Sequence, residues 1–113
     1  MGKTVNVFIS QPMKDKTREE IIKERYKTIA WIYEDLAKAT HTLKDVDKVN
    51  IIDSYFGDNE DVKNAPVRCL GEAIKLMSNA DYVVFCNGWK DARGCRIERT
   101  VANEYGIPCV DVV

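Results

Sequence analysis

The chain has 113 residues, of which 45% are hydrophobic and 31% are charged, with a formal net charge of −1 at pH 7. This length fits one domain with a core of its own, and the near-neutral charge argues against nucleic acid as a partner. No uncharged apolar run approaches the roughly 20 residues of a membrane-spanning helix. We therefore expect one globular domain over residues 1–113, with neither nucleic acid nor membrane as a partner.

The cysteines are spread along the chain without a CxxC pair, and His41 is the single histidine. A zinc site therefore lacks its usual ligand spacing, and we expect no metal and no other cofactor. The first residues, MGKTVNVFIS, contain no apolar segment followed by a small-residue cleavage site. Because secretory signals have both features, we expect a cytoplasmic protein with reduced thiols.

The first half of the chain predicts a strand, a long helix and a second strand. Residues 4–9 (TVNVFI) predict the first strand, and Pro12 lies in the turn that ends it. A capping-box pattern opens the helix, which we expect over residues 17–39. Its apolar stripe predicts a core-facing side that consists of Ile22, Tyr26, Ile29, Tyr33 and Leu36. The second strand is expected over residues 49–52.

The second half continues the alternation of helices and strands. Pro66 suits a first helical turn, and apolar residues at helical spacing predict a helix over residues 66–78. A nearly continuous apolar run, as in a strand covered on both faces, predicts a central strand over residues 81–86. A helix over residues 94–105 should follow, burying Ile97, Val101 and Tyr105. Gly106 would be its C-cap, and residues 110–112 the last strand.

Strict alternation of strands and helices predicts an α/β fold with right-handed crossovers and a parallel sheet. We expect a three-layer sandwich of the flavodoxin-like or Rossmann-like kind, with four parallel strands in the order 2-1-3-4. In such a sheet, ligands bind at the carboxyl ends of the strands. The loops after the first and third strands would gather Ser10, Gln11 and Met13 opposite residues 87–95, and the acidic loop after the second strand could close over them.

Glu98 is the strongest candidate for a chemical group. The predicted helix places it inside the first turn, where the positive end of the helix dipole favours an ionised carboxylate. The chain has no GxGxxG after the first strand, no phosphate-binding GxxxxGKS or GxxxxGKT, and no GxSxG, which disfavours dinucleotide, phosphoryl-transfer and serine-hydrolase chemistry. A carboxylate is the nucleophile that is left. The alternative is an acid that only complements the helix dipole.

Other residues near Glu98 also allow two interpretations each. Trp89 could stack on an aromatic ligand or cover the edge of the core. Asp91 could act as an acid or form the turn before the helix. Arg93 and Arg96 could bind a phosphate or be surface charges. Together, these polar, charged and aromatic side chains suit a ligand that is a small polar molecule with an aromatic part.

The segments VFISQPM, NADYVVFCNGW, RGCRIE and VANEYGIP together resemble the nucleoside 2-deoxyribosyltransferase-like superfamily, closest to its small bacterial and phage members of unassigned function. The resemblance spans nearly the whole chain. It implies a single domain in which Glu98 attacks the anomeric carbon of a deoxyribosyl group and displaces the base. Asp91, the nearest acid in the sequence, would supply a proton to the departing base.

From the loops at this edge of the sheet together with the resemblance, we expect the ligand-binding residues to be Phe8, Ser10, Gln11, Pro12, Met13, Trp89, Arg93 and Gly94. The expected activity is cleavage or transfer at the N-glycosidic bond of a deoxynucleoside or its 5′-monophosphate. The alternative is a nucleotide-binding module of the same fold that senses or sequesters its ligand without turnover. The resemblance further implies a homodimer or a larger homo-oligomer.

Overall fold

The computed structural model describes residues 3–40, 46–53 and 63–112. The elements in chain order are β1 (Lys3–Ser10), α1 (Arg18–Thr40), β2 (Val46–Ile51), α2 (Ala65–Met77), β3 (Tyr82–Phe85), the short 3-10 helix η1 (Trp89–Asp91), α3 (Arg93–Glu104) and β4 (Cys109–Asp111). Each predicted helix and strand is present, with its ends displaced by a few residues at most. Of the predicted acidic loop, residues 54–62 lie outside the described residues.

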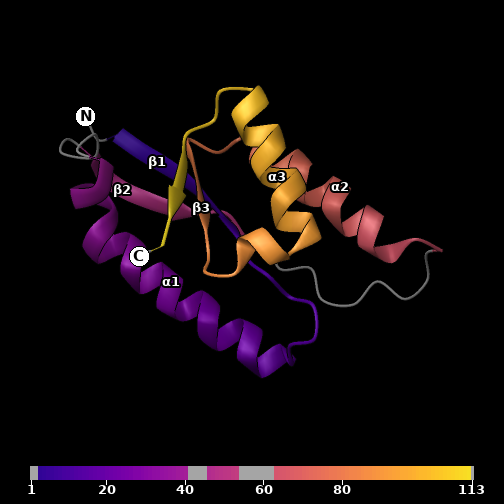
Figure 1. The fold of residues 1–113 in the computed structure, drawn as a ribbon. Helices are drawn as coiled ribbons and strands as arrows, with labels where there is room; N and C mark the ends of the chain where they lie inside the picture. Colours follow the sequence, from indigo (N-terminus) through magenta and orange to yellow (C-terminus); the bar gives the residue numbers. More distant parts are fainter. Residues whose placement is uncertain (1–2, 41–45, 54–62, 113) are drawn as a thin grey trace.

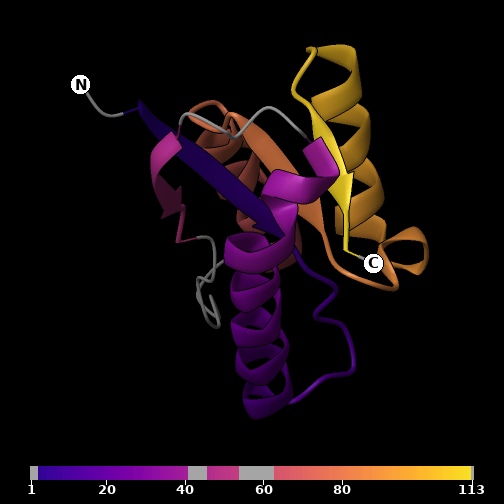
Figure 2. The ribbon, with the colours of Figure 1, turned by 90° about the vertical axis from the view of Figure 1, so that its left-hand side faces the viewer.

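The four strands form one parallel sheet in the order β2-β1-β3-β4, which confirms the predicted topology. The central strand β1 pairs Val7 with Ile51 on one side and Ser10 with Phe85 on the other. Figure 1 shows α1 on one face of the sheet and α2 with α3 on the other, and Figure 2 shows α3 running beside β4. The predicted three-layer sandwich is therefore the observed architecture.

Alternating residues of β1 build the core on both faces of the sheet, as the period of a strand requires. Val7 and Ile9 pack with Ile32 of α1 in one cluster. Phe8 faces the opposite way, into a cluster with Met77 of α2 and Ala102 of α3. The last residues of β1 thus continue this alternation toward the carboxyl edge of the sheet, where one side chain points to α1 and the next to α3.

The helix ends follow the expected chemistry. The Thr17 hydroxyl accepts a hydrogen bond from the Glu20 backbone N–H, and the Glu20 carboxylate accepts one from the Thr17 N–H, so the predicted capping box is confirmed. The C-cap of α3 is Tyr105 and not Gly106 as predicted; Gly106 is the next residue and has a φ of 72°, a conformation that favours glycine. No helix among the described residues combines the length and the apolar character needed to cross a membrane.

The predicted core face of α1 is wrong in part. Tyr26 and Tyr33 are 69% and 60% exposed, although both lie on the predicted apolar stripe. The helix instead buries Ile21, Thr28 and Ile32, a stripe rotated slightly around its axis. A tyrosine ring can lie on the protein surface while its hydroxyl stays hydrated. The apolar character of Tyr26 and Tyr33 therefore did not require these residues to be buried.

The predicted core face of α3 is also wrong in part, although Val101 packs against the core as predicted. Ile97 is 38% exposed and Tyr105 is 82% exposed, whereas α3 buries Cys95, Glu98 and Ala102. A pattern of hydrophobic residues cannot select this face because one of its three buried members is a carboxylate, which is costly to bury. The α3 helix therefore places the Glu98 carboxyl group inside the protein.

Candidate functional site

The turns after β1 and β3 lie side by side at the carboxyl edge of the sheet, as the parallel topology predicts. The Cys86 backbone N–H donates a hydrogen bond to the Ser10 carbonyl at 3.0 Å. Beyond it, a Cβ built on Gly88 would meet Pro12 Cγ at 3.9 Å, and Gly88 has a φ of 87°. The left-handed turn at Gly88 therefore lets the two chain segments pack against each other.

Ser10 and Glu98 meet at this edge. The Ser10 hydroxyl donates a hydrogen bond of 2.6 Å to Glu98 Oε1, and Glu98 is only 8% exposed. Among the described residues, Glu98 accepts no other side-chain hydrogen bond and pairs with no lysine or arginine. A charge-assisted hydrogen bond of this kind orients the carboxylate, but it leaves the acid without a neutralising cation.

Glu98 is in the second turn of α3, because the helix begins at Arg93 and has no acidic residue in its first turn. The expected placement in the first turn, with the helix dipole favouring the ionised form, is therefore wrong. Burial raises the pKa of Glu98 above its ordinary value of 4.5, and the hydrogen bond from Ser10 opposes part of that rise. Burial thus outweighs the hydrogen bond, and the net effect favours the neutral acid.

Two thiols lie at the same edge. Cys86 and Cys95 are both buried, and burial raises the pKa of Cys95 to about 11, with the Ser10 hydroxyl opposing the rise. Burial likewise raises the pKa of Cys86. Because the thiolate is the nucleophilic form, neither cysteine competes with Glu98 as a nucleophile at neutral pH.

The remaining predicted residues of the first turn surround this position. Gln11 is buried, and its Nε2 donates a hydrogen bond of 2.6 Å to the Ile21 carbonyl of α1. Pro12 and Met13 are half-buried. Phe8 is 1% exposed and belongs to the core between the sheet and α2 and α3, so it supports the site from beneath.

A cleft of about 350 Å³ lies beyond the end of β3. It is lined by Phe85, Asn87, Gly88, Trp89, Lys90, Asp91, Asp111 and Val112, so it contains the predicted Trp89 and Asp91 but neither Ser10 nor Glu98. The ring of Trp89 packs against Phe85, with ring centroids 5.4 Å apart. The interpretation of Trp89 as a cover of the core edge therefore holds, and the cleft leaves part of its surface open.

Arg99 is a residue of this region that the sequence did not single out. Its guanidinium lies 4.5 Å from the ring centroid of Trp89 and 4.8 Å from that of Phe85. It also forms an ion pair with Asp111, the last residue of β4. The sequence does place Arg93, Arg96 and Arg99 on one helix face through their i, i+3 spacing. This spacing does not show which of the three arginines packs against the aromatic rings.

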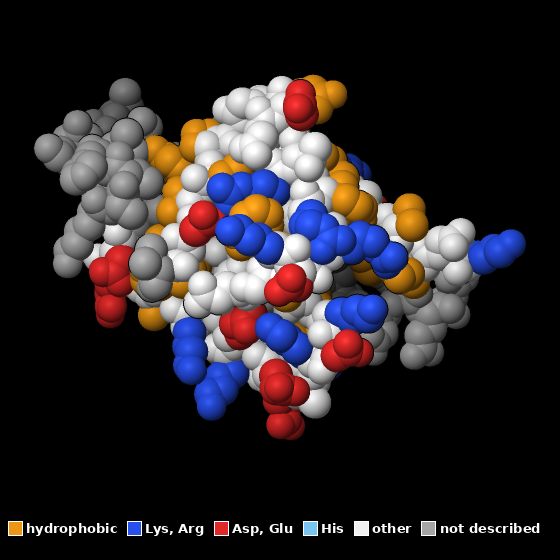
Figure 3. Space-filling model, viewed as in Figure 1, with side chains coloured by type: hydrophobic (Ala, Val, Ile, Leu, Met, Phe, Trp, Pro, Cys, Tyr) orange, Lys and Arg blue, Asp and Glu red, His pale blue; other side chains and the backbone are white. Residues whose placement is uncertain are grey.

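Arg93 and Gly94 are exposed at the start of α3. Arg96 donates a hydrogen bond to the Lys90 carbonyl at 3.0 Å, which closes the turn before the helix. Figure 3 shows lysine and arginine side chains gathered on the face over α3 and η1, with acidic side chains among them. This face therefore offers cations beside the cleft without forming a purely basic surface.

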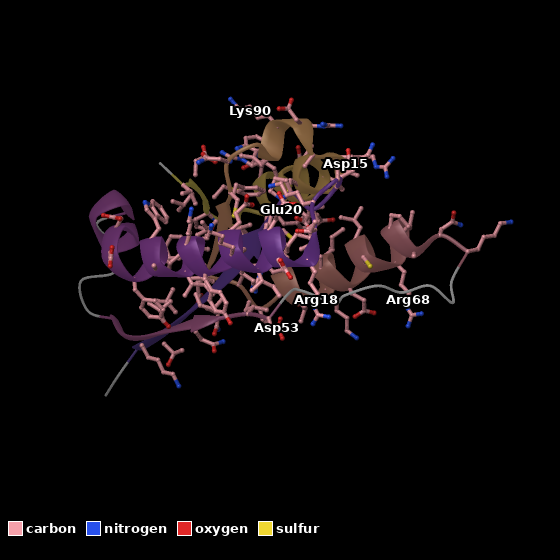
Figure 4. All side chains as sticks on the ribbon, turned by 90° about the horizontal axis from the view of Figure 1, so that it is seen from below. Asp15, Arg18, Glu20, Asp53, Arg68 and Lys90 are labelled. Atoms are coloured by element: carbon pink, nitrogen blue, oxygen red, sulfur yellow. The ribbon has the colours of Figure 1, made fainter. Side chains whose placement is uncertain are left out.

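Charged residues of both signs surround the same end of the sheet on the α1 side. Figure 4 labels Asp15, Arg18 and Glu20 around the N-terminal end of α1, with Asp53 just after β2. Arg25 of α1 donates a hydrogen bond of 3.1 Å to the Ile52 carbonyl, which ties the helix to the end of β2. Asp53 is the one residue of the proposed closing loop 53–58 that is described.

Residues of α1 complete the buried polar cluster, and the sequence analysis did not identify them. Thr28 Oγ1 lies 3.2 Å from Cys86 Sγ and donates a hydrogen bond to the Glu24 carbonyl. The Glu24 carboxylate pairs with Lys16 Nζ at 2.9 Å. The four-residue spacing of Glu24 and Thr28 was a possible signal, but charged residues on all sides of this helix obscured it.

The described part of the chain contains no group of three histidine, cysteine, aspartate or glutamate side chains placed to hold a metal ion. No protein-family model, no curated protein and no solved structure matches this chain.

Proposed function

We propose that the protein cleaves or transfers the N-glycosidic bond of a deoxynucleoside or its 5′-monophosphate, with Glu98 as the nucleophile. The observation that carries the proposal is the buried Glu98 carboxylate, held by the Ser10 hydroxyl at the carboxyl edge of β1 and β3. This edge is where open α/β sheets bind their ligands. The resemblance of the sequence to deoxyribosyltransferase-like proteins supplies the substrate class.

The proposed reaction has two steps. A Glu98 carboxylate oxygen forms a bond to the anomeric carbon while the bond from that carbon to the base nitrogen breaks, and the electron pair leaves with the base. Water or a second base then attacks the same carbon and releases the carboxylate, so the configuration is retained overall. The departing base takes up a proton in the first step, and Asp91, on the turn that leads into α3, is the proposed donor.

The protonation of Glu98 sets a requirement on this chemistry. The nucleophile must be ionised, yet burial raises the pKa of this acid. The Ser10 hydrogen bond favours the anion and points one oxygen away from attack, so the other oxygen is the proposed nucleophilic atom. We therefore expect activity at pH values above the pKa of Glu98, where the carboxylate is ionised.

Arg93 and Arg96 suit a 5′-phosphate on the substrate because both are arginines at the start of α3, and Arg96 bonds to the carbonyl of Lys90, a residue that lines the cleft. Arginine binds phosphate through a planar fork of N–H donors. A preference for monophosphates over nucleosides, lost when both arginines are replaced by alanine, would support this part of the proposal.

The test is base release from a panel of deoxynucleosides and their 5′-monophosphates, followed by chromatography. Glu98→Gln keeps the shape of the side chain and removes the nucleophile, so it should abolish release. Glu104→Gln, at an exposed position of the same helix, is the matched control and should retain it. Release that persists in Glu98→Gln would contradict the proposal.

The panel also tests the non-catalytic alternative. Ligands that bind only the folded state raise its melting temperature. A nucleotide that stabilises the wild type and Glu98→Gln alike, with no base released by either, would indicate a binding module. A chain that neither releases base nor gains stability from any member of the panel would contradict both functions.

A further inference from the structure

The cleft of about 350 Å³ lies beyond the carboxyl ends of β3 and β4, and its walls include Phe85 and Asp111, the last residues of these strands. Neither Ser10 nor Glu98 lines it, so the proposed nucleophile does not account for this space. Ligand pockets commonly measure about 300 to 1,000 Å³. The cleft is therefore at the small end of that range, where a single planar ring system fits better than a large ligand.

Trp89 is the aromatic wall of the cleft, and other side chains hold its indole in place. The ring packs on Phe85 with centroids 5.4 Å apart, and the Arg99 guanidinium lies 4.5 Å from the Trp89 centroid. Arg99 is itself tied to Asp111 by an ion pair. Trp89 is half-buried and lines the cleft. Because its orientation is set before any ligand arrives, stacking on it costs little conformational entropy.

Hydrogen-bonding side chains stand around this indole. Asn87 and Asp91 line the cleft from the turn after β3, and Asp111 lines it from the end of β4. All three residues are exposed, so a ligand can reach them. Carboxylates accept hydrogen bonds from N–H groups, and an amide both donates and accepts. The polar lining therefore suits a ring whose edge carries N–H donors together with acceptors.

The charges at the cleft favour a neutral ligand. The Trp89 ring already has two cations beside it, since Lys90 Nζ lies 5.9 Å and the Arg99 guanidinium 4.5 Å from its centroid. A cationic ligand stacked there would be repelled by both. An anionic ligand would meet the carboxylates of Asp91 and Asp111. A neutral planar ring avoids both costs.

The cleft adjoins the region of the proposed nucleophile. Gly88 lines the cleft, and a Cβ built on it would lie 3.9 Å from Pro12 Cγ in the turn after β1. In the same pair of turns, the Cys86 N–H donates to the carbonyl of Ser10, whose hydroxyl holds Glu98. The cleft and the Ser10–Glu98 hydrogen bond are therefore neighbours across these packed turns.

We propose that this cleft binds the nucleobase, with the base stacked on Trp89 and its edge hydrogen-bonded to Asn87 and Asp91. Nucleobases are neutral planar rings with N–H donors and acceptors on their edges, and stacking on an aromatic side chain accepts any of them. Asp91, the proposed proton donor, then touches the base that it protonates. This inference rests on the proposed function and adds the position of the base. Because the cleft has recognition groups of its own, free bases should bind without a sugar.

Calorimetry with adenine, cytosine and thymine tests this prediction on the wild-type chain, and 2-deoxyribose is the control ligand without an aromatic ring. Trp89→Leu removes the stacking surface and should weaken binding roughly 10- to 100-fold. Asn87→Ala should weaken it less. Asn79→Ala, at an exposed amide in the turn after α2, is the matched control. Glu98→Gln should leave base binding unchanged, because Glu98 does not line the cleft.

Fluorescence gives a second measurement that keeps Trp89 intact. The chain has two tryptophans, and Trp31 packs against the core cluster on the α1 face of the sheet. In Trp31→Phe, all indole emission therefore comes from Trp89. A base stacked on that ring should change its emission saturably, with the dissociation constant found by calorimetry, and 2-deoxyribose should not.

Each outcome decides the proposal. Base binding that changes Trp89 emission, falls at least about tenfold in Trp89→Leu and persists in Glu98→Gln supports it. Absence of binding by every base overturns it, as does binding that leaves Trp89 emission unchanged or that is lost in Glu98→Gln. If Trp89→Leu does not fold, the emission of Trp31→Phe decides.

These measurements need no turnover, so they are independent of the test of the proposed function. Base release from deoxynucleosides without binding of free bases would leave the function standing and remove the base from the cleft. Base binding without release would contradict the glycosidic activity and leave the cleft as the base site of a non-catalytic binding module.

Discussion

The Ser10 hydroxyl and the Glu98 carboxylate, 88 positions apart in the sequence, form one buried hydrogen bond of 2.6 Å. Burial and this bond act on the acid in opposite directions, because burial raises the pKa of Glu98 and the bond lowers it. The balance between them decides how much of the Glu98 carboxyl group is ionised at a given pH. Both groups come from elements that meet only in the folded sheet.

Ser10→Ala should therefore shift the pH dependence of base release. Without the donor the pKa of Glu98 rises further, so the acidic limb of the kcat/KM profile should move to higher pH. Loss of a hydrogen bond to a charged group predicts a fall in kcat/KM of roughly 10- to 100-fold near that limb. Ser78→Ala, at an exposed hydroxyl after α2, is the control, and an unchanged profile in Ser10→Ala would contradict the assigned role.

Glu98→Gln should change stability in a pH-dependent way. The pKa of Glu98 in the folded chain lies above its ordinary value of 4.5, so the folded state binds more protons than the unfolded state between these two values. The contribution of this group to stability is fully present below about pH 4.5 and is lost as pH rises through the folded pKa. Glutamine is neutral at every pH and avoids that loss.

Melting temperatures of both chains between about pH 4 and about pH 8 measure this effect. The variant should be more stable than the wild type by a few degrees at the upper end, and the difference should shrink as the pH falls. Glu104→Gln, which changes an exposed acid of the same helix, should show no such trend. A variant that loses stability relative to the wild type as pH rises would show that the Glu98 anion is favoured by its surroundings.

Thr17→Ala should lower the free energy of unfolding by about 1 kcal/mol, because the Thr17 hydroxyl accepts the Glu20 N–H at the start of α1. Urea denaturation followed by circular dichroism measures the change. Thr100→Ala removes a hydroxyl that bonds to the Arg96 carbonyl within α3, and it should have a smaller effect because no helix cap is lost. Equal effects would mean that the capping box contributes nothing specific.

The sequence was sufficient for the sheet order and for this cap because both depend on local chemistry. Alternating strands and helices restrict the crossovers, and the Thr17–Glu20 pair is read directly from its spacing. The turns after β1 and β3 also came together as parallel pairing requires. These features need no knowledge of which face a helix presents to the core.

Which face of each helix packs against the core could not be predicted from the sequence. Tyr26 and Tyr33 fit an apolar stripe but are exposed, and Glu98 is polar but buried. Hydrophobic periodicity ranks faces by apolar content, so it fails where a polar residue is buried by a long-range partner such as Ser10.

Cysteine alkylation should separate the four thiols by burial. Cys86 and Cys95 are 2% and 3% exposed, whereas Cys109 is half-buried at the start of β4. Because burial raises the pKa of Cys95 to about 11, its thiolate is scarce at about pH 8 and its reaction with iodoacetamide should be slow. Mass spectrometry of the native chain should find the half-buried Cys69 and Cys109 modified before Cys86 and Cys95, and urea-unfolded protein should lose the difference.

Arg99→Ala should destabilise the cleft beside β4. The guanidinium stacks on Trp89 and Phe85 and pairs with Asp111. Cation–π contacts contribute about 0.5 to 1 kcal/mol at partly exposed sites, and a surface ion pair adds at most about 1 kcal/mol, so the expected loss is roughly 1 to 2 kcal/mol. Arg99→Lys keeps the charge without the planar stacking and should lose less.

Denaturant unfolding followed by tryptophan fluorescence measures this loss. Native-state emission comes from Trp31 and Trp89, and only Trp89 contacts Arg99 while Trp31 packs against the other core cluster, so the change in emission on replacing Arg99 reports on Trp89. Removing Arg99 should expose the indole and shift its emission to longer wavelength. Arg93→Ala, at an exposed position at the start of the same helix, should change neither stability nor emission by a comparable amount. If Arg99→Ala and Arg93→Ala behave alike, the stacking observed around Trp89 does not stabilise the fold, and the cleft owes its shape to Phe85 and the backbone turn at Gly88 alone.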